Sequence, residues 1–554
     1  MQKKSNQFNF IDESRPFFIK GRDIISLIIT VTIICMIYSH YDVFSFLEAN
    51  AETREIIVLT GNDLTLEDIL KIAENRADIR VSPEGIKRIK AANDVIQYYV
   101  ENKIPAYGVN TMFGSDHDVT LPVEEIKRFN RINVHQEATK IGDGSRPIVK
   151  TEVLRAAWAL MVNSYARGFS GPSYELVEKI VERVNTNKIP TNVEYGGSMG
   201  DADLIMNNKL ALSLFEDPDF ELGPGEATTI MTHNFITISK AILLIKRFES
   251  LLPRAKVALA LNMEGFRANL SPISEQAMKV TTRVNKHKIQ AELQFLLNQS
   301  ELWKDESSYG PRNLEDPLSI RVSSDVLATV EKSLQRLEKT LIEYSNAVPV
   351  SPMVDTESRK MTVVTEYDTS QLTLDMDQFR QALGLLSISI DGITQKTISR
   401  PFTDLPSGLS SGNPNKYDGL YTYNLSYWNT SLMREALQYS HPVMAMTASF
   451  SAEGTEDYST PFPNSVEMAE DMIDRLEKMV TIEALIGAFA IQRRIEMGQL
   501  SINQVPVQLR NVLKEIIKRS PMQFAEDQQY SLQPLLKYFI AEYNPPKELT
   551  KLTK

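Results

Sequence analysis

Cysteine is almost absent from this chain: Cys35 is the only one among 554 residues. A single cysteine forms no internal disulfide, and the chain beyond it has no thiolate nucleophile and no cysteine-ligated zinc. An excess of positive charge is also absent, since 60 Lys and Arg stand against 71 Asp and Glu and leave a net charge of −11. Without a basic stripe, the composition argues against a nucleic-acid partner.

Long uncharged segments are rare, and the exception lies near the N-terminus. Ile24–Tyr38 (IISLIITVTIICMIY) carries no charge. As a helix it would be about 22 Å long, which is short of the roughly 30 Å hydrocarbon core of a bilayer. Aromatic residues that favour a membrane interface extend the run as far as Phe46. Basic residues precede it and acidic residues follow it, so the positive-inside rule places the N-terminal tail in the cytoplasm.

This segment has three possible interpretations. The favoured one is a single-pass membrane protein, with a cytoplasmic basic tail at 1–22, a transmembrane anchor in the lipid bilayer at 23–44 and a linker at 45–56. The second is a cleaved signal peptide, because Ala49-Asn50-Ala51 has the small-x-small form of a cleavage site. The third is a buried core helix. The favoured interpretation predicts an extracytoplasmic globular domain.

The rest of the chain has mainly helical periodicity, and the expected strands are few and short. The predicted fold class is therefore mainly α, with an elongated bundle of long helices. We divide it into an N-terminal active-site domain at 57–227 and a long-helix bundle at 228–554. Long helices are expected at about 228–270, 276–302, 322–346, 371–397, 430–447, 463–498 and 505–519.

The segment Tyr107–Gly114 reads YGVNTMFG and is expected to be a loop between two helices. It places a phenol among glycines, where the backbone can approach a ligand closely. A tyrosine serves as a general base only if its surroundings lower its pKa of about 10. For an isolated Tyr-Gly pair, a ring packed under a surface turn is the simpler interpretation.

The loop is accompanied by other motifs in a fixed order. It matches the Y-G-V-N-T-G-F-G loop of the histidine and aromatic amino acid ammonia-lyases at all positions but Met112. Further segments are similar to motifs of the same family: Leu66–Ile69, Leu154–Gly171, Pro224–Glu226, Asp316–Arg321, His441-Pro442 and Glu456-Asp457. The chain therefore resembles this family over about residues 57–500. The resemblance implies the ammonia-lyase fold and a homotetramer with shared active sites.

The resemblance also implies roles for individual residues. Tyr107 is similar to the base that removes the β-proton of an amino acid, and Glu456 stands where the family keeps a carboxylate near the substrate. Arg321 resembles the residue that pairs with the substrate carboxylate, a task suited to a forked guanidinium. Tyr367 stands at the Phe of the family's G-N-F-H-G motif, although the flanking residues have lost that motif.

Two further positions concern the ligand. His135 corresponds to one of two residues that select the substrate ring, and a histidine there is typical of histidine lyases. A single histidine in a helix is equally common as an ordinary hydrogen-bonded polar group. Thr232 stands where the family has an Asn that contacts cofactor and substrate, and Leu318 where the family has a Tyr.

The largest departure from the family lies at Gly196–Leu204, GGSMGDADL, where the family reads G-S-V-G-A-S-G-D-L. The family's Ala-Ser-Gly cyclises and dehydrates to a methylidene-imidazolone, the electrophile that activates the amine as a leaving group. Gly200, Asp201 and Ala202 replace that tripeptide, and Asp cannot dehydrate to a methylene. Ser198 is close by but is followed by Met199 rather than by Gly. We therefore predict that this cofactor is absent.

A metal site is a weaker alternative. Asp116-His117-Asp118 follows the first loop, and Asp201 and Asp203 lie in the replaced segment; together these side chains offer oxygen ligands and one imidazole. The simpler interpretation is a solvated loop together with the family's ordinary Asp at 203, since charge runs are usually solvated. No metal is predicted.

Three functions remain open. The first is an ammonia-lyase-like enzyme that binds an amino-acid or carboxylate ligand and catalyses C–N elimination without a methylidene-imidazolone. The second is a catalytically inactive binding or assembly protein that keeps the lyase fold. The third is a metal-dependent, hydrolase-like site. Fold alone does not separate them, because function depends on the site.

Overall fold

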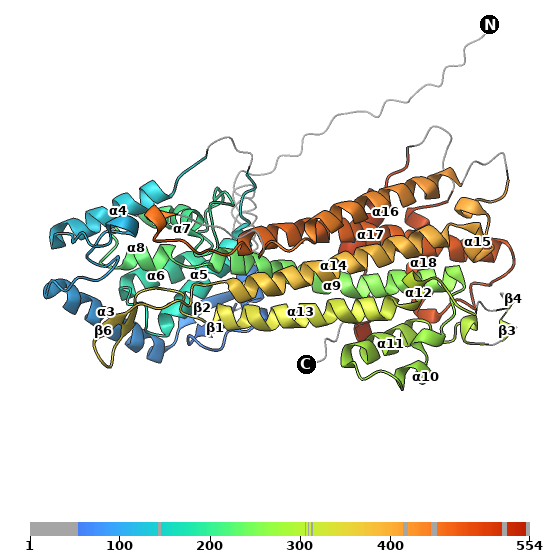
Figure 1. Cartoon of the computed structure of the whole chain (residues 1–554), viewed down its shortest axis with the longest axis horizontal. Helices are drawn as coiled ribbons and strands as arrows, with labels where there is room; N and C mark the ends of the chain where they lie inside the picture. Colours follow the sequence, from blue (N-terminus) through green and yellow to red (C-terminus); the bar gives the residue numbers. More distant parts are fainter. Residues whose placement is uncertain are drawn as a thin grey trace, which may run out of the picture. The chain divides into compact units, whose positions relative to one another are not determined.

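The expected long helices are present in the computed structural model. It describes residues 54–549 apart from 142–145, 305, 308–309, 312–313, 414–418, 445–450 and 523–528. The longest helices of the described chain lie side by side (Figure 1): α9 (Phe235–Phe266), α13 (Ser323–Ser345), α14 (Ser370–Thr397), α16 (Leu420–Tyr439) and α17 (Phe462–Glu496). The ranges of α13, α14 and α17 agree within a few residues with those expected from apolar periodicity. Helix α9 begins later than expected, and α16 both begins and ends earlier than expected.

Helices α9 and α17 run in the same direction. The Lys240 ammonium pairs with the Glu470 carboxylate at 2.9 Å, and further along both helices the Arg494 guanidinium donates to the Gly265 carbonyl oxygen at 2.7 Å. Near this second contact the helices touch backbone to backbone, since a Cβ on Gly487 would lie 2.6 Å from the Asn262 nitrogen. A glycine at that position therefore sets how closely the two helices approach.

Helix α14 runs parallel to α9 and α17, whereas α13 and α16 run the other way. Thr340, near the end of α13, donates its hydroxyl to Asp375, near the start of α14, at 2.6 Å. Gln395, near the end of α14, donates to Thr430 in the middle of α16 at 2.9 Å. The N-termini of α9, α14 and α17 consequently lie at one end of the bundle.

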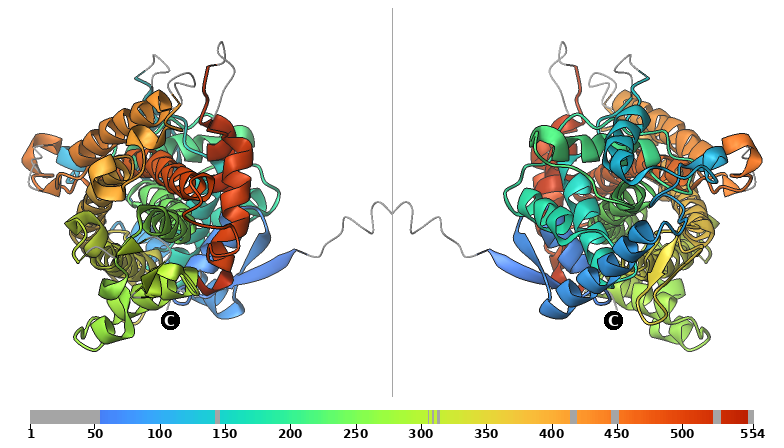
Figure 2. Two further views of the ribbon diagram at one scale, coloured as in Figure 1. Left: turned by 90° about the vertical axis from the view of Figure 1, so that its right-hand side faces the viewer. Right: turned by 90° about the vertical axis from the view of Figure 1, so that its left-hand side faces the viewer.

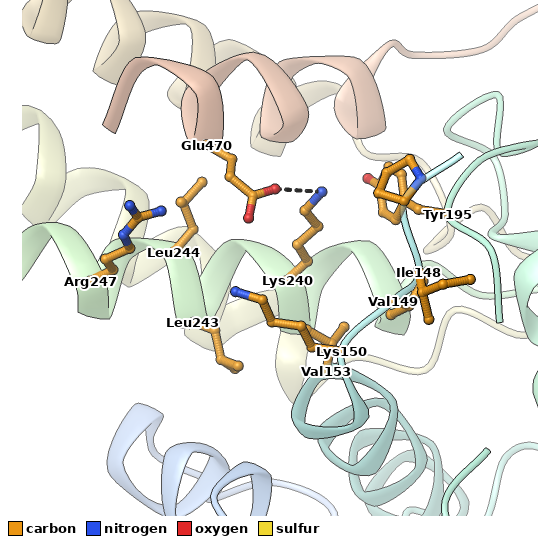
Figure 3. A pocket seen from close by; sticks show the side chains of 11 residues that line it. Ile148, Val149, Lys150, Val153, Tyr195, Lys240, Leu243, Leu244, Arg247 and Glu470 are labelled. Carbon is orange, nitrogen blue, oxygen red and sulfur yellow. Dashed lines mark ion pairs between the residues drawn. The ribbon is translucent and has the colours of Figure 1, made fainter. Parts of the chain in front are cut away.

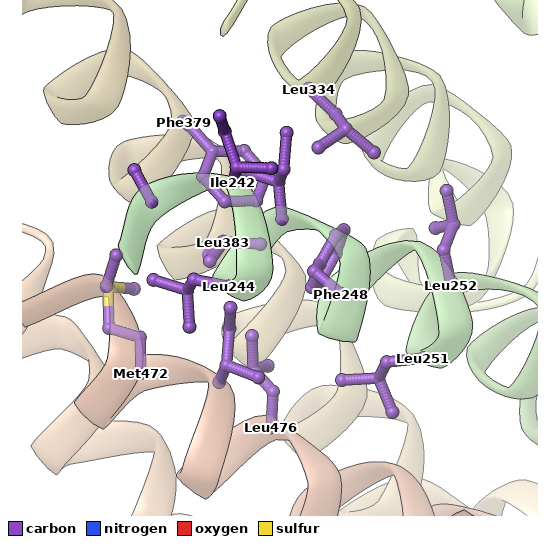
Figure 4. Close-up of a cluster of buried hydrophobic side chains, with 14 of the residues drawn as sticks. Ile242, Leu244, Phe248, Leu251, Leu252, Leu334, Phe379, Leu383, Met472 and Leu476 are labelled. Atoms are coloured by element: carbon purple, nitrogen blue, oxygen red, sulfur yellow. The ribbon is translucent and has the colours of Figure 1, made fainter. Parts of the chain in front are cut away.

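The core of the bundle forms around α9, which is buried on nearly every side. Phe248 and Leu251 of α9 belong to one apolar cluster with Phe379 of α14, Leu334 of α13 and Met472 of α17 (Figure 4). The Phe248 and Phe379 rings meet edge to face, with their centres 5.2 Å apart. The end views show α9, in green, surrounded by the other helices (Figure 2). An all-round apolar helix is typical of the centre of a large protein.

Shorter elements make up the N-terminal part. Thr65 forms a capping box with Asp68 at the start of α2, and Ser82 caps α3 with Pro83 at its first position. The elements of this part are β1 (Glu55–Leu59), α2 (Leu66–Ala73), β2 (Ala77–Val81), α3 (Pro83–Glu101), α4 (Ile126–Glu137), α5 (Thr151–Ala166), α6 (Tyr174–Asn185), α7 (Leu204–Ala211) and α8 (Glu226–Met231).

The remaining helices lie between and after the long ones. They include α11 (Val284–Leu296), α12 (Leu318–Arg321) and α18 (Val507–Arg519). The described residues from Ile56 onwards form one compact unit. The division into domains at 57–227 and 228–554 stays a prediction.

The predicted membrane localisation requires correction. Among the residues that the structure describes, no helix is both long enough and apolar enough to cross a bilayer. The apolar helices α9 and α17 instead carry charged side chains that pair with each other, as Arg247 does with Glu477 at 2.7 Å, and they are covered by protein. The predicted anchor at 23–44 lies outside the described residues.

Candidate active site

Three helix N-termini meet at the segment that replaces the cofactor tripeptide. Thr369, which precedes α14, donates its hydroxyl to the Gly200 carbonyl oxygen at 3.0 Å and is hydrogen-bonded to Thr460, which lies just before α17. Asn234, which precedes α9, donates its side-chain amide to the Asp201 carbonyl oxygen at 3.1 Å. A helix N-terminus carries partial positive charge. The three together therefore favour negatively charged groups at this place.

The backbone at Gly200 has no room for a side chain. Its φ is +99°, and an added Cβ would lie 1.6 Å from the Thr460 carbonyl oxygen. Ser198 is held by the same turn, because its hydroxyl donates to the Ala202 carbonyl oxygen at 3.0 Å and accepts from the Gly200 N–H at 3.3 Å. The segment thus lacks the serine and the space for the alanine from which the imidazolone is made. Its residues do not fit that cofactor.

The Tyr107 loop packs against α8. The Thr228 hydroxyl donates to the Gly108 carbonyl oxygen at 2.7 Å, and a Cβ on Gly108 would lie 2.2 Å from that hydroxyl, so only glycine allows this approach. The half-buried Tyr107 ring lies edge-on to Phe113, with the ring centres 6.1 Å apart. The Gly114 N–H donates to the Tyr107 hydroxyl oxygen at 3.3 Å. The loop therefore holds the phenol at a defined place.

Acidic and phenolic side chains from four loops lie within electrostatic reach of one another. Burial raises the pKa of Asp201 to about 7, and the negative charges of Glu456 and Asp368 add to the effect. Burial also raises the pKa of Tyr107, assisted by Glu456 and Tyr367 against the opposing hydrogen bond from Gly114. For Tyr367, burial is again the first cause, followed by Asp201, Asp368 and Glu456. We call Tyr107, Asp201, Tyr367, Asp368 and Glu456 the acidic cluster.

The acidic cluster unites residues that the sequence predicted separately: Tyr107, Glu456 and Tyr367, together with Asp201 from the replaced tripeptide. Asp368 was missed as a site residue. It follows Tyr367 directly and accepts a hydrogen bond from the Ser370 hydroxyl at 2.7 Å, at the start of α14. The loss of the family's motif around Tyr367 was the available signal, because new charges beside a site residue change its chemistry.

Thr232 lies at the end of α8, where its hydroxyl donates to the Thr228 carbonyl oxygen of the preceding turn at 2.7 Å. The buried amide of Asn234, two residues later, instead reaches the carbonyl oxygens of Asp201 and Tyr367. Asn234 therefore makes the contact to the replaced segment that the sequence led us to seek at Thr232. The substrate-binding role of Thr232 stays a prediction.

His135 does not lie on the face of α4 that is turned towards the acidic cluster. Phe129 of α4 stacks on Phe113, which in turn meets Tyr107. His135 comes six residues after Phe129, which turns it by roughly 120° around the helix axis. Its ring packs beside Phe215, with centres 5.3 Å apart, and its Nδ1 lies 2.8 Å from the Arg131 carbonyl oxygen of its own helix. These contacts are those of an ordinary hydrogen-bonded polar group, which is the simpler interpretation of this histidine. Its role in substrate selection stays a prediction.

Arg321 lies far from the acidic cluster of its own chain. Its neighbour Ser319 accepts a hydrogen bond at its carbonyl oxygen from Ser389 of α14. The acidic cluster lies at the start of the same helix, next to Thr369, about 30 Å away at 1.5 Å per residue. The guanidinium pairs with the exposed Glu315 carboxylate at 3.3 Å. One chain alone therefore does not bring Arg321 and Tyr107 together.

The suggested metal ligands do not converge. Among the described residues, no group of three or more His, Cys, Asp or Glu side chains has the arrangement of a metal site. The buried Asp203 carboxylate accepts hydrogen bonds from the Thr237 N–H and hydroxyl, both at 2.7 Å, and so fastens the first turn of α9. The His117 Nδ1 lies 2.9 Å from the Gly114 carbonyl oxygen on an exposed loop.

Known proteins match this chain over most of its length. A family model described as aromatic amino acid lyase matches residues 64–221 and 211–515. The histidine ammonia-lyase of Myxococcus xanthus (strain DK1622) is 23% identical over 466 residues, which cover 80% of this chain and 90% of that protein.

Solved structures share the fold at low sequence identity. Ergothionase from Treponema denticola, an ergothioneine-degrading enzyme, superposes with a TM-score of 0.79 at 20% identity and covers 88% of this chain and 98% of its own. Phenylalanine aminomutase from Pantoea agglomerans gives a TM-score of 0.78 at 16% identity, with 88% and 98% covered.

Proposed function

Because this chain belongs to the aromatic amino acid lyase family, we propose that its acidic cluster binds the cationic nitrogen of an amino-acid-type ligand without a methylidene-imidazolone. The match to the family model confirms the family assignment that the Tyr107–Gly114 loop predicted. The observation that carries the proposal is the charge of the site: beside burial, which is the first cause, the groups that raise the pKa values of Tyr107, Asp201 and Tyr367 are carboxyls and phenols. A cationic ligand offsets that charge.

The same site favours one kind of elimination. By the mechanism of this family, expelling ammonia from an amino acid needs the electrophile that Gly200-Asp201-Ala202 does not supply. A quaternary ammonium needs no such activation, because it has no N–H proton to lose to a base: it stays cationic, and the electron pair of the breaking C–N bond departs on a neutral tertiary amine. The phenol rings of Tyr107 and Tyr367 beside three carboxyls suit a quaternary ammonium, which binds to aromatic faces and negative charge. We therefore propose β-elimination from a betaine of histidine or an aromatic amino acid.

In this reaction Tyr107 takes the β-proton, the Cα–Cβ double bond forms, and the trialkylamine leaves. Burial and nearby negative charge keep the Tyr107 phenol protonated in the ligand-free site. A bound quaternary cation offsets the nearby negative charge and so lowers the pKa of the phenol. The ligand thus generates its own base. The ergothioneine-degrading enzyme from Treponema denticola supports this substrate class, since ergothioneine carries a trimethylammonium group.

A second function, binding without catalysis, is favoured by the raised pKa of Tyr107 alone. It predicts that a betaine binds at the acidic cluster and is recovered unchanged. The two functions share the ligand and differ only in the fate of the C–N bond.

Incubation with ergothioneine, L-histidine betaine, L-phenylalanine betaine and the parent amino acids tests the proposal. We expect trimethylamine and a conjugated acid from at least one betaine, measured by proton NMR and ultraviolet absorbance, and no ammonia from L-histidine or L-phenylalanine. A Tyr107→Phe variant should lose the turnover and retain binding. Binding of a betaine without turnover would select the second function. Release of ammonia from the parent amino acids, or binding of no betaine, would contradict the proposal.

The affinity for a betaine should depend on pH through Asp201. Its pKa of about 7 makes the carboxyl mostly neutral at pH 6 and mostly ionised at pH 8, so affinity for a cation should rise severalfold across this interval. Isothermal titration with L-histidine betaine measures the change. Asp201→Asn should flatten the rise, whereas Asp219→Asn, at an exposed position outside the cluster, should preserve it. A steep rise that persists in Asp201→Asn would exclude Asp201 as its source.

We further propose that the site is completed by a second copy of the chain. Leu374, Leu385 and Ile388 are about half exposed and lie on one face of α14, between the acidic cluster at its start and α12 near its end. A second copy docked antiparallel on this face would bring its own Arg321 towards the acidic cluster. Such an arrangement would form the shared sites of the homotetramer that the resemblance to the family implies.

Light scattering coupled to size-exclusion chromatography tests the assembly. We expect a tetramer for the unaltered protein and a smaller species for Leu385→Glu, because a buried carboxylate without a partner opposes association. Val507→Glu, at a similarly exposed position on α18, serves as the control and should remain tetrameric. A monomeric unaltered protein would contradict the shared site.

A further inference from the structure

A cavity of about 180 Å³ lies at the side of the bundle, outside the acidic cluster. Its walls come from the start of α5, from one face of α9 and from Tyr195 (Figure 3). Apolar side chains supply much of the lining, among them Ile148, Val153, Leu243 and Leu244. Ile148 is half exposed and Val153 is buried, so the cavity passes from solvent to the core.

Cationic side chains surround this apolar lining, and two of them are already paired. The Lys240 ammonium contacts the Glu470 carboxylate at 2.9 Å and lies 3.9 Å from the centre of the Tyr195 ring (Figure 3). Arg247 also lines the cavity and forms a two-pronged pair with Glu477, with both contacts at 2.7 Å.

Lys150 differs from these two. It lines the cavity at the start of α5, and within the part of the chain that the structure describes its ammonium makes no ion pair or hydrogen bond. Its positive charge is therefore available to an anion at the mouth of an apolar cavity. This combination of an apolar lining and one uncommitted cation matches a ligand with an apolar body and a single negative charge.

The size of the cavity limits that ligand. A cavity of about 150 Å³ in another protein holds one benzene molecule, so the present one holds a single ring, or a short acyl chain, with a small attached group. We propose that the cavity is a second ligand site for an aryl or short acyl monocarboxylate. The apolar body contacts Leu243, Leu244 and Val153, and the carboxylate contacts the Lys150 ammonium.

The cavity is distinct from the acidic cluster but linked to it by the backbone. The Tyr195 N–H donates to the Pro147 carbonyl oxygen, and the Val149 N–H donates to the Val193 carbonyl oxygen, both at 2.8 Å. The chain then continues from Tyr195 through Gly196 into the turn that holds Gly200 and Asp201. The cluster residues themselves do not line the cavity. The proposal is therefore independent of the proposed function.

Titration calorimetry with benzoate as the probe, and with benzyl alcohol as its neutral counterpart, tests this site. We expect one benzoate to bind per chain, and more tightly than benzyl alcohol. Lys150→Gln should weaken benzoate binding about three- to fivefold, as expected for an exposed ion pair, and should leave benzyl alcohol unaffected. Lys332→Gln, at another exposed lysine, is the matched control. Ile148→Trp should fill the cavity and abolish binding of both probes.

A fourth variant, Arg321→Gln, distinguishes this cavity from the site that the acidic cluster is proposed to form with Arg321. Benzoate binding should persist in Arg321→Gln, because that side chain lies at the far end of α14. The absence of benzoate binding at millimolar concentrations would overturn the proposal, and so would equal affinity for the two probes. Loss of binding in Arg321→Gln with none in Lys150→Gln or Ile148→Trp would assign benzoate to the other site and would equally overturn it.

Discussion

Replacement of Asp377 by alanine is expected to lower the free energy of unfolding by about 3–5 kcal/mol, because it leaves a buried charge without its partner. One Asp377 carboxylate oxygen accepts hydrogen bonds from the Arg380 guanidinium and from the Ser465 hydroxyl, the latter at 2.7 Å. The other accepts from the Val443 N–H at 2.8 Å. Arg380 has no exposed surface, so water cannot replace the lost carboxylate.

Denaturant unfolding at one fixed protein concentration measures this effect. Asp471→Ala is the matched control, since Asp471 forms an ion pair with Arg475 one turn along α17 and its side chain is 45% exposed. An exposed pair of this kind contributes less than about 1 kcal/mol. Equal effects of the two substitutions would show that the Asp377 pair is not the strong link that its burial indicates.

The position of Asp377 connects this stability to the acidic cluster. Through Ser465 it fastens α14 to the first turn of α17, and through Val443 it holds the chain that leaves α16. Glu456 and Thr460 lie between those two attachment points in the sequence. The carboxylate therefore helps to fix where the last loop of the cluster begins and ends, and Asp377→Ala should weaken betaine binding as well.

The sequence could predict the elements but not this buried pair. Periodic apolar residues located α13, α14 and α17, because this pattern depends on neighbours within one or two turns. Asp377 and Arg380 have the i,i+3 spacing of an ordinary surface pair, and charged residues with this spacing are usually solvated. Their burial depends on α16 and α17 arriving from far along the chain.

The residues of the candidate site were likewise only partly predictable from the sequence. The motif resemblance located Tyr107, Tyr367 and Glu456, and the structure places them around Asp201. It could not reveal Asp368 as a third carboxyl of the cluster, nor Asn234 as the residue that reaches Asp201, since both depend on where three helix N-termini meet. His135 was matched by position alone, and its orientation depends on a rotation around α4 that the motif does not contain. Arg321 needs a second chain.

Restoration of the family tripeptide is expected not to restore the cofactor. In the triple variant Gly200→Ala, Asp201→Ser, Ala202→Gly, the new Cβ at 200 would lie 1.6 Å from the Thr460 carbonyl oxygen, and the residue would need a φ of +99°. Either the turn moves or the alanine is excluded, and we expect a loss of stability of about 3–5 kcal/mol for Gly200→Ala alone. Intact mass spectrometry should show neither the unaltered protein nor the triple variant lighter by two waters.

The double variant Asp201→Ser, Ala202→Gly keeps Gly200 and supplies the control. It removes the steric conflict while providing the serine whose dehydration makes the methylene. If it loses two waters and the triple variant does not, the contact between Gly200 and Thr460 is what excludes the imidazolone. Loss of two waters by the triple variant would mean that this turn accommodates a side chain at 200. The absence of the electrophile would then depend on Asp201 and Ala202 alone, and the argument for a quaternary ammonium leaving group would rest on the acidic cluster.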